Sequence, residues 1–215
     1  MHTKDACKIY SVLEKLYVKK GTNFNFLEFE NPFQILVMTI LSAQTTDKTV
    51  NRVKQKLFEK YPDCKSLSKA NITEVEELIR STGFYHSKAK NIVSASEILC
   101  REYDCKVPKT IEELVNLPGV GRKTANIVLN HAYNINEGIA VDTHVKRVSF
   151  RLGLTENTDP VKVEKDLKSI YPKQAWGKIN FLFISHGRAV CDAKKPACEK
   201  CGLKDICRYY RENPL

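Results

Sequence analysis

The sequence predicts an all-α fold of about ten helices with short connections. Nearly every segment carries apolar residues at helical spacing, as in the stripe formed by Ile9, Leu13 and Leu16. No segment alternates polar and apolar residues for long, and no hairpin signal joins two strands. With 42% hydrophobic residues among 215, and only 9 glycines and 8 prolines, the chain has the composition of a packed globular protein.

Proline next to a capping residue marks the start of two helices. Asn31-Pro32 combines an N-cap residue with proline at the first helical position, and it opens the very apolar segment 32–43. A helix that is apolar on all sides belongs at the centre of a domain. We expect a further helix at about 47–61, and Asp159-Pro160 opens another in the same way.

Other boundaries follow from capping boxes and glycines. Thr73 and Thr110 each precede a glutamate by three residues, which predicts a helix start near both. Gly83 and Gly153 stand where C-terminal caps are expected. Residues 175–190 form the last long predicted helix.

The charge of the chain favours a polyanionic partner. A formal net charge of +10 and a pI near 9.1 point to nucleic acid first and to an acidic membrane second. A basic surface with no such role is the alternative. The start of the chain has no signal-peptide pattern, and the longest apolar run, residues 33–41, is too short to span a bilayer. We therefore expect a soluble intracellular protein.

The eight cysteines are distributed unevenly. Four of them crowd into 17 residues, with one close pair flanked by gaps of six and five: Cys191, Cys198, Cys201 and Cys207. Four thiolates can bind zinc or a 4Fe–4S cluster, and this spacing leans to iron–sulfur while leaving zinc open. The other four are scattered, and we expect them to be free thiols: Cys7, Cys64, Cys100 and Cys105.

A glycine turn joins two predicted helices in the middle of the chain. One helix covers Thr110–Leu117, the turn is Pro118-Gly119-Val120-Gly121, and the second helix runs from Arg122 to about His131. The unpaired N–H groups and positive dipole end of the second helix make a phosphate site. An ordinary helix–helix corner is the alternative interpretation.

Two chemically useful side chains follow that turn. Lys123 lies in the first turn of the second helix, where an amine can attack a carbon electrophile or simply bind a phosphate. Asp142 begins the next helix as a plausible N-cap. Facing a lysine, its carboxylate could also stabilise a cationic sugar or help to move protons.

Several of these motifs together resemble one family. They are LPGVGRKTAN (117–126), the VDTH that follows it, the cysteine spacing, LSAQTTD (41–47) and GFYHSKAKNI (83–92). In this order they resemble the endonuclease III family of helix-hairpin-helix DNA glycosylases and abasic-site lyases. The resemblance covers nearly the whole chain.

The resemblance implies two domains. One is a six-helix barrel over residues 25–135 that carries the helix-hairpin-helix motif at 110–131. The other is a helical domain made of residues 1–24 and 136–215, with a 4Fe–4S cluster loop at 191–207 held by Cys191, Cys198, Cys201 and Cys207.

The resemblance also implies a bifunctional DNA glycosylase and abasic-site lyase of base excision repair. A damaged nucleotide, for instance thymine glycol, is flipped out of the duplex. Lys123 then attacks C1′, a Schiff base forms, and β-elimination cuts the strand 3′ to the lesion. Asp142 supports the cationic sugar. DNA contacts fall to the hairpin (Gly119, Val120, Gly121 and Arg122), while Gln44 and Phe84 are candidates for filling the vacated space.

Three alternatives remain at this stage. Adenine-specific mismatch glycosylases lack a lysine at position 123, and thymine-mismatch glycosylases have a tyrosine there. A non-catalytic DNA-binding module would bind DNA without a covalent intermediate. The expected partner is double-stranded DNA that contains a damaged base or an abasic site, and no membrane is involved. We expect the protein to be a monomer in a prokaryotic cytoplasm, close to the nucleoid; a nuclear location stays open.

Overall fold

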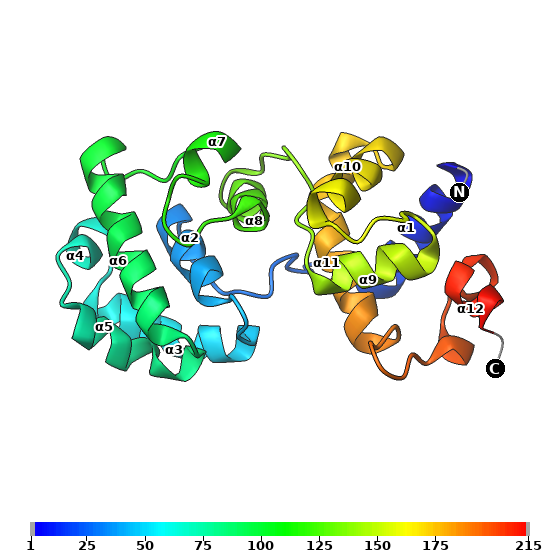
Figure 1. The fold of residues 1–215 in the computed structure, drawn as a ribbon, viewed down its shortest axis with the longest axis horizontal. Helices are drawn as coiled ribbons and strands as arrows, with labels where there is room; N and C mark the ends of the chain where they lie inside the picture. Colours follow the sequence, from blue (N-terminus) through cyan, green and yellow to red (C-terminus); the bar gives the residue numbers. More distant parts are fainter. Residues whose placement is uncertain (1–2, 214–215) are drawn as a thin grey trace. The chain divides into compact units, whose positions relative to one another are not determined.

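The structure, a computed structural model, describes residues 3–213. Every regular element in that range is a helix, so the predicted all-α class is confirmed (Figure 1). No helix among the described residues is both long and apolar enough to cross a membrane. The chain folds as two compact units: residues 25–135 form one, and residues 1–24 with 136–215 form the other.

The unit of residues 25–135 is built on one central helix. Its elements are α2 (Pro32–Leu41), α3 (Asp47–Lys60), α4 (Cys64–Ser68), α5 (Ile72–Ile79), the 3₁₀ turn η1 (Arg80–Thr82), α6 (Tyr85–Glu102), α7 (Ile111–Leu114) and α8 (Arg122–Tyr133). Every residue from Phe33 to Leu41 is buried, and α2 packs against α3, α6 and α8. The prediction that this apolar helix lies at the centre of a domain is confirmed.

Local capping explains where these helices begin. The Asn31 side chain accepts a hydrogen bond from the Gln34 N–H at 2.9 Å, with proline at the first helical position. Thr110 caps α7 by accepting from the Glu113 N–H at 3.3 Å. The helix start predicted near Thr73 is confirmed, but Asn71 caps it in place of Thr73: the Asn71 side chain accepts from the Thr73 N–H, and α5 starts at Ile72.

The other unit combines both ends of the chain. Its elements are α1 (Thr3–Tyr17), α9 (Thr143–Leu152), α10 (Pro160–Ile170), α11 (Lys173–Ala189), the 3₁₀ turns η2 (Cys198–Lys200) and η3 (Lys204–Ile206), and α12 (Arg208–Glu212). Helix α11 packs against α1 and α9, and α12 packs against α9. Helix α1 thereby helps to support α11, which leads into the segment that carries the four clustered cysteines.

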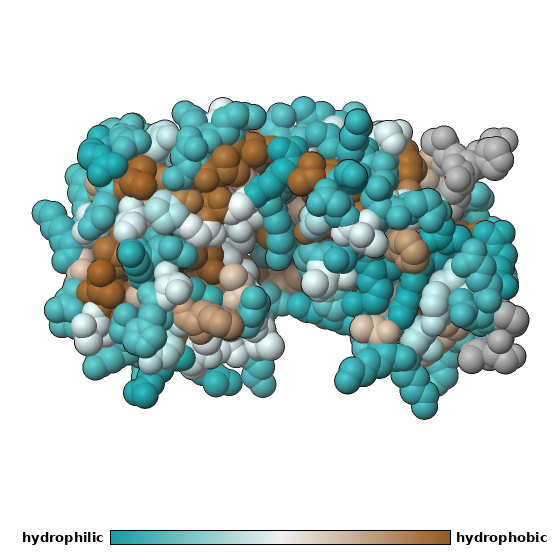
Figure 2. Space-filling model, viewed as in Figure 1, coloured by the Kyte–Doolittle hydropathy of each residue, from teal (hydrophilic) through white to brown (hydrophobic). Residues whose placement is uncertain are grey.

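The face of the molecule in Figure 2 is mostly hydrophilic, with hydrophobic residues in patches between the hydrophilic ones. Large apolar side chains with more than a third of their surface exposed are few in the described range: Leu16, Ile72, Phe84, Val115, Phe150 and Val161. Phe84, at 67%, is the most exposed of them. So large an exposed fraction is unusual for a phenylalanine and is consistent with a functional role.

Candidate functional site

The glycine turn packs closely against its own unit. Gly119 has φ of +77°, and a β-carbon there would lie 2.9 Å from Asn91 Nδ2 and 3.1 Å from Ile40 Cγ2. Both the backbone angle and the neighbours therefore require glycine. Val120 is buried, so only its backbone can face a ligand. The turn therefore packs against Ile40 of α2 and Asn91 of α6, contacts that the sequence of the turn alone does not predict.

Gly121 differs from Gly119 both in its backbone angle and in its surroundings. Its φ of −95° suits any residue, and a β-carbon there would meet nothing within 4 Å. It is the N-cap of α8, and no side chain caps that end of the helix. The first N–H groups of α8 thus have no side-chain cap, as a phosphate site requires. Arg122 is exposed next to them.

Lys123 and Asp142 each stand at the start of a helix. Lys123 is exposed in the first turn of α8, and its ammonium has no hydrogen bond or ion pair within residues 3–213. Asp142 is the N-cap of α9, where its Oδ1 accepts a 2.8 Å bond from the Val145 N–H. The capping role predicted for Asp142 is confirmed. Lys123 belongs to the unit of residues 25–135 and Asp142 to the other unit.

Gln44 and Phe84 share an unusual backbone. Both are exposed, and both have left-handed angles, with φ of +52° and +49°. Residues other than glycine rarely adopt these angles, and strain of this kind clusters at functional sites. Gln44 follows the end of α2, and Phe84 is the N-cap of α6.

A buried lysine joins these two loops. Lys88, only 4% exposed, donates from Nζ to Thr45 Oγ1 at 2.7 Å and to the Thr82 carbonyl at 2.8 Å. Thr45 also donates to the Thr82 carbonyl. Burial lowers the pKa of Lys88. This Lys88 bridge (Lys88, Thr45 and Thr82) links the neighbour of Gln44 to the turn that precedes Phe84.

Sequence reasoning missed the Lys88 bridge, although a signal existed. Lys88 stands four residues before Ile92, on the buried stripe of α6. A lysine on an apolar stripe needs polar partners in the core, and only the folded structure identifies them.

The four clustered cysteines line one cavity. Cys191, Cys198, Cys201 and Cys207 share it with Arg151, His186 and Tyr209, among others. Arg151 Nη1 donates to Cys191 Sγ at 3.4 Å, and the Leu203 N–H donates to Cys201 Sγ at 3.4 Å. Hydrogen bonds to sulfur and a nearby guanidinium suit thiolates that bind a metal.

His186 adds a further contact to this cavity. Burial lowers its pKa to about 4, so the ring is neutral at physiological pH. The Tyr17 hydroxyl is hydrogen-bonded to Nδ1 of this ring at 3.0 Å, and Nε2 lies 3.6 Å from Cys201 Sγ. Tyr17 comes from α1, so the first helix of the chain orients a group that faces the cysteines.

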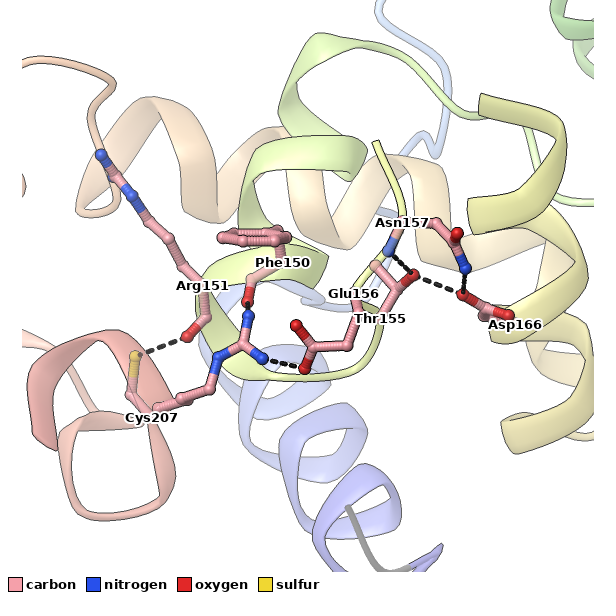
Figure 3. A network of polar contacts seen from close by, with 8 residues as sticks. Phe150, Arg151, Thr155, Glu156, Asn157, Asp166 and Cys207 are labelled. Atoms are coloured by element: carbon pink, nitrogen blue, oxygen red, sulfur yellow. Dashed lines mark hydrogen bonds and ion pairs between the residues drawn. The ribbon is translucent and has the colours of Figure 1, made fainter. Parts of the chain in front are cut away.

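The end of α9 holds the last cysteine in place. Cys207 Sγ donates to the Arg151 carbonyl at 3.4 Å, and the adjacent Arg208 binds the Phe150 carbonyl at 2.6 Å and the Glu156 carboxylate (Figure 3). The Arg208 guanidinium also lies over the Phe150 ring, 4.7 Å from its centroid. These contacts anchor the start of α12 to α9.

The loop after α9 has its own support. The Asp166 carboxylate accepts from Thr155 and, at 2.8 Å, from Asn157 Nδ2 (Figure 3). The hydrogen bond from Thr155 and, after it, the one from Asn157 lower the pKa of Asp166. Glu156, the partner of Arg208, is therefore presented by an ordered loop.

Three of the cysteines expected to be scattered converge instead. Within the described residues, one group of three or more potential metal ligands has its donor atoms all within 4.8 Å of one another, and it consists of Cys64, Cys100 and Cys105. This group belongs to the unit of residues 25–135, whereas the cavity lined by Cys191, Cys198, Cys201 and Cys207 belongs to the other unit.

A family comparison agrees with the motifs. Residues 37–173 match the model of the HhH-GPD superfamily, described as base excision DNA repair proteins. That range covers more than half of the chain and includes the glycine turn, Lys123 and Asp142. The chain belongs to the HhH-GPD superfamily of base excision DNA repair proteins.

Similar individual proteins narrow the class further. The chain is 50% identical to endonuclease III of Synechocystis sp. over 202 residues, which is 94% of this chain and 91% of the relative. It is 43% identical to endonuclease III of Thermotoga maritima over 181 residues, 84% of each chain. It also superimposes with a TM-score of 0.92, at 38% identity and over 99% of this chain and 98% of the other, on endonuclease III in a trapped covalent intermediate with DNA.

Proposed function

We propose that this base excision repair enzyme, a DNA glycosylase with abasic-site lyase activity, uses Lys123 as its nucleophile. The Lys123 amine attacks C1′ of the damaged nucleoside, the bond from C1′ to the base breaks, and the base leaves with its electron pair. Opening of the sugar ring gives an imine between Nζ and C1′. An exposed amine with no partner among the described residues supports this role.

The imine then makes strand cleavage easy. It acidifies the proton on C2′, and loss of that proton expels the 3′ phosphate by β-elimination. Hydrolysis of the remaining imine returns the free amine of Lys123. The glycosylase and lyase activities thus follow from one nucleophile.

Asp142 stabilises the positive charge that develops on the sugar and helps to transfer protons. Its helix-capping bond engages Oδ1 and fixes the direction of the carboxylate. A fixed carboxylate costs little reorganisation when the charge appears.

The hairpin positions the DNA for this chemistry. Gly119, Val120, Gly121 and Arg122 bind the phosphate backbone through the uncapped N–H groups of α8 and the arginine charge. The open space above Gly121 supports this assignment, because a backbone can approach there without meeting a side chain. A net charge of +10 favours the same partner, double-stranded DNA.

Gln44 and Phe84 fill the space that the flipped nucleotide leaves. Their exposure and left-handed backbone support this role. An aromatic ring at Phe84 can stack on the neighbouring bases. The substrates are oxidised pyrimidines such as thymine glycol, and the enzyme works as a monomer in a bacterial cytoplasm, near the nucleoid.

Cys191, Cys198, Cys201 and Cys207 hold a 4Fe–4S cluster. The four cysteines line one cavity, and hydrogen bonds from Arg151 and from the Leu203 N–H to two of their sulfur atoms support this assignment. When bound, the cluster holds the loop of residues 191–207 in shape, and the lysines of that loop can then meet phosphates.

The test is borohydride trapping on a duplex with one thymine glycol. The wild-type chain should form a covalent adduct, Lys123→Ala should form none while still binding the duplex, and Lys90→Ala, which removes an exposed lysine of α6, should behave like wild type. An adduct that persists in Lys123→Ala would place the nucleophile elsewhere. Base release by the wild type without any adduct would instead indicate a one-step glycosylase.

A further inference from the structure

Three thiols from distant parts of the sequence meet in the unit of residues 25–135. Cys64 is the first residue of α4, Cys100 lies near the end of α6, and Cys105 follows that helix. The Sγ atoms of Cys64 and Cys100 are 3.3 Å apart, and all three sulfur atoms lie within 4.8 Å of one another. Cys64 is buried, whereas Cys100 and Cys105 are partly exposed. We refer to these residues as the thiol triad.

The backbone holds Cys105 in this position at a cost. Asp104 and Cys105 have successive left-handed angles, with φ of +51° and +55°, and the Cys105 N–H donates to the Leu99 carbonyl at 2.9 Å. Such angles cost roughly 1–2 kcal/mol for a residue other than glycine. The turn that ends α6 requires these angles, and aspartate tolerates them better than cysteine does. Strained residues of this kind are typical of ligand sites.

The spacing of the triad fits one metal ion. A soft ion about 2.3 Å from each of three thiolates, in their plane, sets the sulfur atoms ~4.0 Å apart. The triad spans this value, from 3.3 Å to at most 4.8 Å. Around such an ion, the sulfur atoms of Cys64 and Cys100 would move apart from 3.3 Å towards this value. An iron–sulfur cubane, whose four thiolates bind separate iron atoms, would require wider spacing.

The donor set selects the ion. Thiolates favour soft ions such as Cu(I) and Zn²⁺, and protein zinc sites almost always have four ligands. No histidine or carboxylate of the described residues joins the triad as a fourth donor at this spacing. Lys65 interacts electrostatically with Cys100 and Cys105 and offsets part of the thiolate charge. We propose that Cys64, Cys100 and Cys105 bind one Cu(I) ion in three-coordinate geometry.

The bound ion would stabilise one part of the fold. It would tie α4, α6 and the turn at 103–105 together, because each contributes a ligand. An ion that binds the folded chain more tightly than the unfolded chain raises the unfolding temperature. This site is separate from Lys123, Asp142 and the loop of residues 191–207, so the proposal does not depend on the repair mechanism.

Cu(I) titration of the holoprotein tests the site. The reduced protein, with its iron content intact, is titrated without oxygen against a competing Cu(I) chelator, using wild type, Cys105→Ser and Cys7→Ser. Cys7 is an exposed cysteine of the other unit and serves as the control. Wild type and Cys7→Ser should retain one Cu(I) per chain, with three sulfur neighbours by X-ray absorption and a higher unfolding temperature. Cys105→Ser should bind at least 100-fold more weakly and show no shift in unfolding temperature.

Cys105 is partly exposed, so Cys105→Ser should fold, and its unfolding temperature without copper checks this. Equal Cu(I) affinity in wild type and Cys105→Ser would overturn the proposal. So would copper uptake that releases iron, because the ion would then be at the other cysteines. A Cys64–Cys100 disulfide that resists the reductant and excludes copper would also overturn it.

Discussion

Replacement of Lys88 by methionine tests whether the Lys88 bridge positions the loops that carry Gln44 and Phe84. Methionine keeps the length and apolar stem of the side chain but removes both donors. A hydrogen bond from a charged donor contributes about 1.5–3 kcal/mol. Thr45 keeps its own bond to the Thr82 carbonyl, and methionine also removes the cost of burying an ammonium. We therefore expect a loss of stability of only about 1 kcal/mol.

The effect on base excision should be larger than the effect on stability. If loop positioning loses the equivalent of one such bond, about 1.5–3 kcal/mol, the rate falls by roughly 10- to 100-fold. The assay is single-turnover excision of thymine glycol from a duplex, alongside thermal unfolding. Lys90→Met, which removes an exposed lysine two residues away on α6, is the matched control.

The pH dependence of stability gives a second readout for Lys88. Burial lowers its pKa from the ordinary value of 10.5, so the folded chain releases this proton before the unfolded chain does. The free energy of unfolding therefore rises with pH up to about 10.5. Over that range it should rise more in the wild type than in Lys88→Met, which lacks the titrating group. Excision by Lys88→Met within twofold of Lys90→Met, with both variants folded, would refute the positioning role.

Three further predictions concern Asp142, the hairpin glycines and His131. Asp142→Asn keeps an oxygen that can accept from the Val145 N–H, so the unfolding temperature should stay within about 1–2 °C of the wild-type value. The rate of base excision should fall by at least about 100-fold, because the carboxylate charge is lost. An active Asp142→Asn would leave Asp142 with a structural role alone. Gly119→Ala should cost about 2–4 kcal/mol in denaturant unfolding because of its φ and its contact with Asn91, whereas Gly121→Ala should keep full stability and lose DNA affinity in a binding titration. Burial lowers the pKa of His131 from 6.5 to about 4, so the unfolded chain takes up this proton first as the pH falls. The free energy of unfolding should therefore drop by up to about 3 kcal/mol between pH 6.5 and 4, and His131→Gln should flatten that part of the profile.

Features that depend on neighbouring residues could be predicted from the sequence. The starts at Asn31-Pro32 and Thr110, and the cap at Asp142, were predictable because the capping atom and the N–H it accepts from are three residues apart. The start near Thr73 was predictable as well, although Asn71, two residues earlier, supplies the cap.

Features that depend on packing could not be predicted in this way. Cys64 and Cys100 are 36 residues apart, and their sulfur atoms meet because α4 packs on α6. Lys88 and Thr45 are 43 residues apart and meet in the core. Neither pair has a spacing that a periodic pattern would detect. The four cysteines near the C-terminus were recognisable only because a short loop brings them together.

Three glycines of the unit that carries the hairpin occur for different structural reasons, which the sequence alone does not distinguish. Gly83 has φ of +65° and ψ of 153°, a combination nearly restricted to glycine, and no atom would touch a β-carbon there, so the backbone angle alone requires glycine. Gly119 is required by its angle and by the contact with Asn91. Gly121 is required by neither, since its angle is ordinary and the space beside it is empty. A glycine with no internal reason points to something outside the chain, and at the uncapped start of α8 the group that fits is a phosphate.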